Sequence, residues 1–220
     1  GADSMVQRAG SGETRFDDSV GIGSSAGVDL TTRSVTINDR FVISAPEGPI
    51  RIAAADDIIV NGEVSNFFGA IQLSAGDDVL FGSNARIAAS HAAVTIRADA
   101  DGSSGGTGGA VLMSNGAIIS ASILDVRADE NIQVSFVSAV SLVRMTSNNG
   151  AIVAASETDA VNIEAFELAL RSSTGIGTSN PIRTTVNTIA ARNTGSGGVR
   201  IENSNRFFFG IGVADGLSGI

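Results

Sequence analysis

Three pairs of adjacent acidic residues are the side chains of this chain with the clearest chemical potential: Asp56-Asp57, Asp77-Asp78 and Asp129-Glu130. Paired carboxylates can bind Ca²⁺ through their oxygens, and they can act as general acid and base on a glycosidic bond. Asp residues also cap tight turns and keep a repetitive protein soluble. Because these acids recur, whereas an enzyme site tends to occur once, we interpret them as turn residues. We assign no catalytic residue and keep the six acids as the candidate Ca²⁺ ligands.

Each acidic pair belongs to a phrase that the chain repeats. This phrase consists of an apolar residue, a spacer, a small residue, the acids and a second apolar alternation. It occurs at 52–60, 73–81 and 126–134. Strand–turn–strand units of this kind cannot bury an apolar face alone, so they must stack on their neighbours. The phrase therefore predicts an architecture more than an activity.

The other residues that carry chemistry do not form a recognisable site. His91 is the single histidine and the chain has no Cys, so neither a zinc site nor a catalytic triad is indicated, and we expect His91 at a coil corner. The glycine-rich stretch 102–109 lacks the Lys-Ser/Thr of a phosphate-binding loop and precedes a strand. Residues 75–80 faintly echo calcium-binding nonapeptide repeats, but the regular short period of those repeats is absent. We therefore expect no cofactor, with Ca²⁺ as the open alternative.

Two aromatic clusters, Phe67-Phe68 and Phe207–Phe209, are the densest in the chain. Adjacent residues of a strand point to opposite faces, so one ring of such a pair must face outward. We expect these rings to pack in the core or against a loop, and the open alternative is a surface for a sugar or a partner.

Composition excludes several classes of protein. Of 220 residues, 27 are Gly, 43% are hydrophobic and all 14 basic residues are Arg, while the net charge is −9. Isolated arginines outnumbered by dispersed acids do not suit nucleic acid. No apolar run is long enough to span a bilayer as a helix and no N-terminal signal pattern is present, so we expect no membrane insertion.

Period-two alternation predicts strands throughout the chain. The clearest cases are 35–37, 71–75, 94–98, 111–113, 161–165, 168–170 and 199–201. Only 161–172 also fits a helix, with acids and an arginine at helical spacing, and its neighbours favour a strand.

The spacing of the repeat gives the length of a coil. The small residue after each alternation serves as a marker, and the markers are Ala54, Ala75, Ala98, Ala128, Ser147 and Ala165. Their intervals are roughly 20 residues, a length typical of solenoid repeats, except for the longer interval from Ala98 to Ala128. That interval contains the Gly/Ser-rich stretch 101–109, which we expect to leave the stack as a loop. Coils of this length predict an all-β fold, a single-stranded parallel β-helix (β-solenoid) of about nine coils and roughly 40–45 Å in length.

For domain organisation we expect an N-terminal extension at 1–18, whose first four residues resemble a cloning remnant, and a solenoid segment at 19–220. No capping repeat is evident at either end, so we interpret the chain as a piece of a longer solenoid.

The phrases at 69–80, 96–102, 172–182 and 199–203 resemble the repeats of filamentous-haemagglutinin-like bacterial adhesins. The similarity covers most of the chain from about Asp29 onward. It implies a right-handed parallel β-helix in an exported, extracellular or cell-surface protein with a structural and adhesive stalk role in adhesion, aggregation or biofilm. From the recurrence of the acids we expect no catalytic activity. The implied partners are a host or neighbouring-cell surface, including its glycans, and adjacent coils of the parent chain.

Two other functions remain open. A β-helix carbohydrate-active enzyme, either a polysaccharide lyase or a glycoside hydrolase, predicts three or more outward carboxylates with an Arg in one groove. A calcium-stabilised surface module predicts melting that depends on Ca²⁺.

Overall fold

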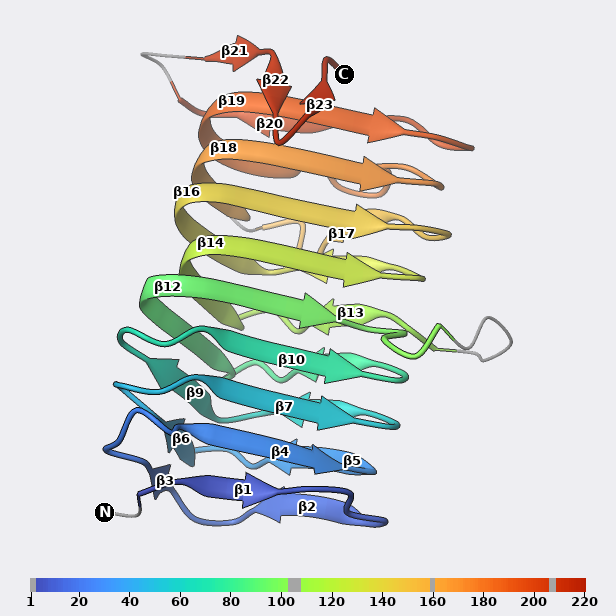
Figure 1. Ribbon diagram of the computed structural model, residues 1–220. Coiled ribbons are helices and arrows are strands. Elements are labelled where there is room, and N and C mark those ends of the chain that lie inside the picture. Colours follow the sequence, from blue (N-terminus) through green and yellow to red (C-terminus); the bar gives the residue numbers. More distant parts are fainter. Residues whose placement is uncertain (1–2, 103–107, 159–160, 206–208) are drawn as a thin grey trace.

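The computed structural model describes residues 3–102, 108–158, 161–205 and 209–220. Within these ranges the chain is all-β without a helix, and its parallel strands stack as a solenoid of about nine turns (Figure 1). In Figure 1 the near strands β4 (Val28–Thr32) and β7 (Ile50–Ala54) run to the right, the far strands β2 (Glu13–Phe16) and β5 (Ser34–Ile37) run to the left, and the chain climbs from the N-terminus. This path is right-handed, so the predicted single-stranded, right-handed parallel β-helix is confirmed.

Each coil contributes to three faces. The front face consists of β1 (Met5–Gln7), β4, β7, β10 (Ile71–Ala75), the C-terminal parts of β12 (Arg86–Arg97), β14 (Ile118–Ala128), β16 (Phe136–Ser147), β18 (Ile163–Ser172) and β19 (Ile182–Asn193), and β21 (Gly210–Ile211). The back face consists of β2, β5, β8 (Ile58–Val60), β11 (Val79–Phe81), β13 (Val111–Met113), β15 (Ile132–Val134) and β17 (Ile152–Ala154).

The side face consists of β3 (Val20–Gly21), β6 (Val42–Ser44), β9 (Glu63–Asn66), the N-terminal parts of β12, β14, β16, β18 and β19, and β20 (Ile201–Asn203). The long strands bend from the side face to the front face where their register shifts, between Ala89 and Ala93 in β12. An antiparallel hairpin, β22 (Val213–Ala214) and β23 (Leu217–Ser218), follows the last coil.

The core is a set of apolar ladders that run along the axis. On the front face, Ile52 pairs with Leu73 and Leu73 pairs with Ile96, and all three side chains are buried. Alternation places every second residue of a strand inside, so the same register fills the core coil after coil. One cluster of buried residues thus extends from Phe16 to Ala191.

Most predicted strands are confirmed. The intervals 71–75 and 111–113 coincide with β10 and β13, and the ambiguous stretch 161–172 contains the strand β18 and no helix. The marker intervals Ala54 to Ala75 and Ala128 to Ser147 are also observed as paired positions.

The solenoid begins before the predicted boundary at residue 19. Strands β1 and β2 pair in parallel with β4 and β5, so the stretch 5–16 forms the first coil instead of an extension. Its two strands are very short, and alternation over so few positions does not mark them as a repeat.

The marker interval from Ser147 to Ala165 is wrong. Thr146 pairs with Arg171, which puts Ser147 opposite Ser172 in the next coil. Ala165 instead lies on the side face opposite Val186. The coil that follows Ser147 is therefore longer than the sequence markers indicated.

The long interval after Ala98 is confirmed, because Val94 pairs with Leu124 and Arg97 pairs with Arg127. Of the expected loop 101–109, residues 103–107 lie outside the described part of the chain.

Candidate functional site

The structure brings the first two acidic pairs together at the turn between the front and back faces. The backbone N–H of Asp77 donates to the carbonyl of Asp56 (3.2 Å), and that of Asp78 donates to Oδ1 of Asp57 (3.0 Å). The four acids therefore occupy the same turn in neighbouring coils.

The third pair, Asp129-Glu130, is separated from them by one coil. Oδ1 of Asp78 accepts the N–H groups of Gly109 (2.9 Å) and Ala110 (2.8 Å), and the N–H of Glu130 then donates to the carbonyl of Gly109 (3.1 Å). Gly109 thus lies between Asp78 and Glu130, next to Asp99, whose backbone N–H donates to the carbonyl of Asp77 (3.2 Å).

Several of these acids connect one turn to the next. Oδ2 of Asp56 lies 2.8 Å from Nε of Arg33, and the side-chain amide of Asn149 donates to both carboxylate oxygens of Asp129 (2.9 and 3.0 Å). Together with the bonds to Asp57 and Asp78, these contacts join each turn to the turn of the next coil. Across the described ranges, no three His, Cys, Asp or Glu side chains converge in a way that could hold a metal ion.

The pKa of the Asp77 carboxyl is raised above its ordinary value of 3.8. Partial burial is the largest cause, because it disfavours the charged carboxylate. The negative charges of Asp57, Asp78, Asp56 and Asp101 add to it, in that order. Ionised Asp77 is therefore less favourable in the folded chain than in the unfolded one.

His91 lies at the corner between the side and front faces, where the sequence predicted it. Its ring centroid is 4.5 Å from that of Phe67 and 6.0 Å from that of Phe68, and both phenylalanines are exposed. Phe207 and Phe208 of the second aromatic cluster lie outside the described residues, while Phe209 is exposed.

A groove of about 530 Å³ on the front face was not expected from the sequence. We call it the arginine groove, and its lining includes Arg127, Arg144, Arg171, Arg192, Thr146, Asn148 and Asp215. These four arginines are isolated from one another in the sequence, but the fold gathers them.

The register of the front strands explains the groove. Arg127, Thr146, Arg171 and Arg192 occupy one outward position in four successive coils. Two positions earlier in each strand, Asp125, Arg144, Ala169 and Ala190 form a second outward column. Because alternate residues share a face, both columns point to the same side of the sheet.

The C-terminal hairpin covers one end of this surface. Ala214 and Leu217 pack on Ala169 and Ala190, whose small side chains leave room for the hairpin. Asp215 and Gly216 between them adopt positive φ angles of 50° and 74°, which a tight hairpin turn requires. The turn thereby holds the Asp215 carboxylate at the groove.

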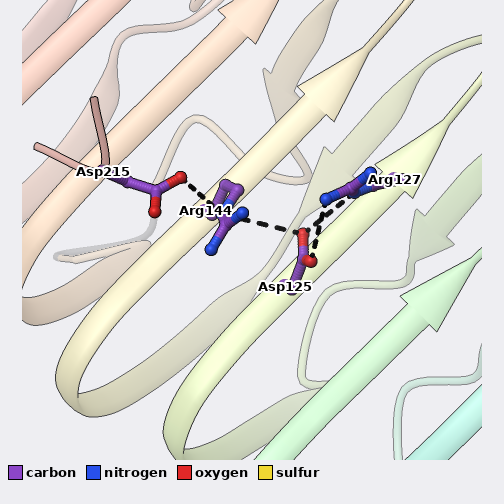
Figure 2. A network of polar contacts seen from close by, with 4 residues as sticks. All are labelled: Asp125, Arg127, Arg144 and Asp215. Carbon is purple, nitrogen blue, oxygen red and sulfur yellow. Dashed lines mark hydrogen bonds and ion pairs between the residues drawn. The ribbon is translucent and has the colours of Figure 1, made fainter. Parts of the chain in front are cut away.

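Opposite charges alternate along part of the groove (Figure 2). Nε of Arg144 lies 2.7 Å from Oδ2 of Asp215 and 4.0 Å from Oδ1 of Asp125, and Nη2 of Arg127 lies 3.4 Å from Oδ2 of Asp125. The Nε–H of Arg144 is buried without an aligned hydrogen-bond acceptor among the described residues, so its contact with Asp215 is an ion pair.

Arg171 and Arg192 are different, since neither forms an ion pair with an acid in the described ranges. They are paired neighbours on adjacent strands, which lie about 4.8 Å apart. Two guanidinium groups thus project from equivalent positions without a described counter-ion.

The distribution of charge along the sequence is the signal that could have revealed this surface. Residues 1–130 hold 17 acids and 8 arginines, whereas residues 131–220 hold six of each. The net negative charge therefore resides in the first part of the chain. The turns next to the groove carry Asn148, Asn149 and Thr194 where earlier turns carry acids.

Comparison with protein-family models, with curated proteins and with solved structures finds no match to this chain. In the part of the chain that the structure describes, no helix is long and apolar enough to cross a membrane.

Proposed function

We propose that this chain is a structural and adhesive stalk segment of an exported bacterial protein, without catalytic activity of its own. It acts outside the cell or at the cell surface and supports adhesion, aggregation or biofilm formation. Its partners are a host or neighbouring-cell surface, including surface glycans, and the adjacent coils of a filamentous-haemagglutinin-like parent protein.

The observation that carries this proposal is the uninterrupted apolar core along the axis of the solenoid. Each coil pairs with the next through a parallel backbone ladder, so the stack transmits rigidity from one end to the other. A stiff rod is suited to holding a binding surface away from a cell.

The turn acids give further support. Asp57, Asp78 and Asp129 use their carboxylates in contacts between coils, so these groups are already engaged in holding turns together. A general acid and base, in contrast, must converge on one bound substrate.

A glycan and polysaccharide binding screen on the purified chain, run with and without Ca²⁺ and followed by product analysis of each hit, tests the proposal. Binding without shortened or unsaturated products supports an adhesive segment. Cleavage would replace the proposal with a carbohydrate-active enzyme, and binding of no glycan at all would leave a spacer.

The calcium-stabilised alternative is tested by thermal melting in Ca²⁺ and in chelator. The matched variant is Asp77→Asn/Asp78→Asn, which removes two carboxylates from the crowded turn. An increase in Tm with Ca²⁺ that this variant loses would establish the calcium module instead.

A further inference from the structure

We propose that the arginine groove binds a uronic-acid polysaccharide and that the Asp215 carboxylate of the chain itself competes with this ligand for the groove. This inference rests on the proposed adhesive function, for which it names the ligand class. It assigns the binding surface to the C-terminal coils of the chain.

The first argument is the charge of the groove. Arg171 and Arg192 stack in register with no acid of the described chain paired to either, and like charges on neighbouring strands repel each other. A carboxylate that lies across both guanidinium groups removes this repulsion. Arginine is suited to this role because its planar fork donates two parallel hydrogen bonds to a carboxylate.

The second argument is that the groove already holds a carboxylate. Asp215 enters from the hairpin and lies 2.7 Å from Nε of Arg144, so both the size and the charge of a carboxylate fit this surface. Strands β22 and β23 are very short, and such a hairpin contributes little stability of its own. A ligand with several carboxylates can therefore displace Asp215 without unfolding the solenoid.

The third argument favours a sugar acid over an acidic peptide. The floor of the groove is the face of a sheet, and the backbone groups of β14, β16 and β18 are used in the parallel ladder between coils. A peptide that adds to a sheet needs a free strand edge, which this floor does not offer. Thr146 and Asn148 instead provide hydroxyl and amide groups that can bond to sugar hydroxyls beside the arginines.

The test is titration calorimetry of the full chain with an oligogalacturonate, with a neutral galactan oligomer and poly-L-glutamate as comparison probes. We expect oligogalacturonate to bind, the neutral oligomer not to bind, and affinity to fall as salt is added. Arg171→Gln/Arg192→Gln should weaken binding about tenfold or more. The control Arg51→Gln/Arg86→Gln makes the same change in net charge at two exposed arginines outside the groove and should have little effect.

Asp215→Asn gives the most specific result, because loss of a competing carboxylate should strengthen oligogalacturonate binding several-fold. Arg171→Lys/Arg192→Lys keeps both charges without the fork and should retain only part of the affinity. Far-UV circular dichroism of each variant establishes that the solenoid is folded.

Four results would overturn the inference: no binding of oligogalacturonate, equal losses in the groove and control variants, weaker binding by Asp215→Asn, or a preference for poly-L-glutamate. None of them would by itself contradict the stalk function, which requires only that some surface glycan binds without turnover.

Discussion

Replacing Leu73 with Ala is the sharpest test of the stacked core. Leu73 is fully buried on β10 and lies in register between Ile52 and Ile96. The change deletes three carbons, which at about 0.8 kcal/mol each correspond to about 2.4 kcal/mol of lost transfer free energy. The backbone ladders on both sides hinder collapse of the resulting cavity, so we expect a total loss of about 3–4 kcal/mol in the free energy of unfolding.

The assay is urea denaturation followed by far-UV circular dichroism, with Gln72→Ala as the matched control. Gln72 is on the same strand but points outward and is exposed, so its replacement should change stability by about 0.5 kcal/mol or less. If both variants shift the midpoint equally, Leu73 does not lie in a ladder of core residues and the assigned register is wrong.

Three further predictions concern polar and turn residues. Asn162→Ala removes the side-chain amide that donates to the buried Ser135 carbonyl and accepts from the backbone N–H of Arg183, so we expect a loss of about 1–3 kcal/mol per hydrogen bond in the same denaturation assay, and an unchanged midpoint would contradict this. Gly76→Ala places a Cβ 2.0 Å from the Ala55 carbonyl oxygen, so the coils must separate and Tm should drop well below that of the wild type, whereas an unchanged Tm would refute the close approach. The pKa of Asp77 is raised in the folded state. The stability that protonated Asp77 contributes is therefore fully present below the ordinary pKa of 3.8, and it is lost as the pH rises through the folded-state pKa. Asp77→Asn should therefore raise the urea midpoint at pH 7 and not near pH 3, and the opposite pH dependence would refute the assignment.

The fold could be predicted wherever alternation and turn residues coincide. Ile71–Ala75 and Val111–Met113 alternate cleanly between turn residues, and β10 and β13 occupy these intervals. The Gly/Ser-rich composition of 101–109 predicts a loop that leaves the stack and lengthens the coil that contains it. The longer coil after Ser147 has no such composition, so the sequence does not reveal its extra length, and the marker Ala165 does not correspond to Ser147.

The charge distribution indicates a less acidic C-terminal part, but a constant repeat length could not predict which residues line the arginine groove. Arg127, Thr146, Arg171 and Arg192 are neighbours in space, but their spacings in the sequence are unequal, so no constant interval connects them. Asp215 belongs to a hairpin outside the repeat, and its position depends on packing of Ala214 and Leu217 over two small residues. Variable coil length thus hides a surface that the parallel register assembles.

The central claim is that this solenoid is an adhesive stalk segment, and a bead adhesion assay tests it most directly. Beads coated with the chain through an added N-terminal tag are applied to a cell layer, with bare beads as the blank and the soluble chain as competitor. We expect coated beads to adhere above the blank, the soluble chain to displace them, and no carbohydrate fragments to be released. Adhesion equal to the blank, or release of carbohydrate fragments by the chain, would contradict the account.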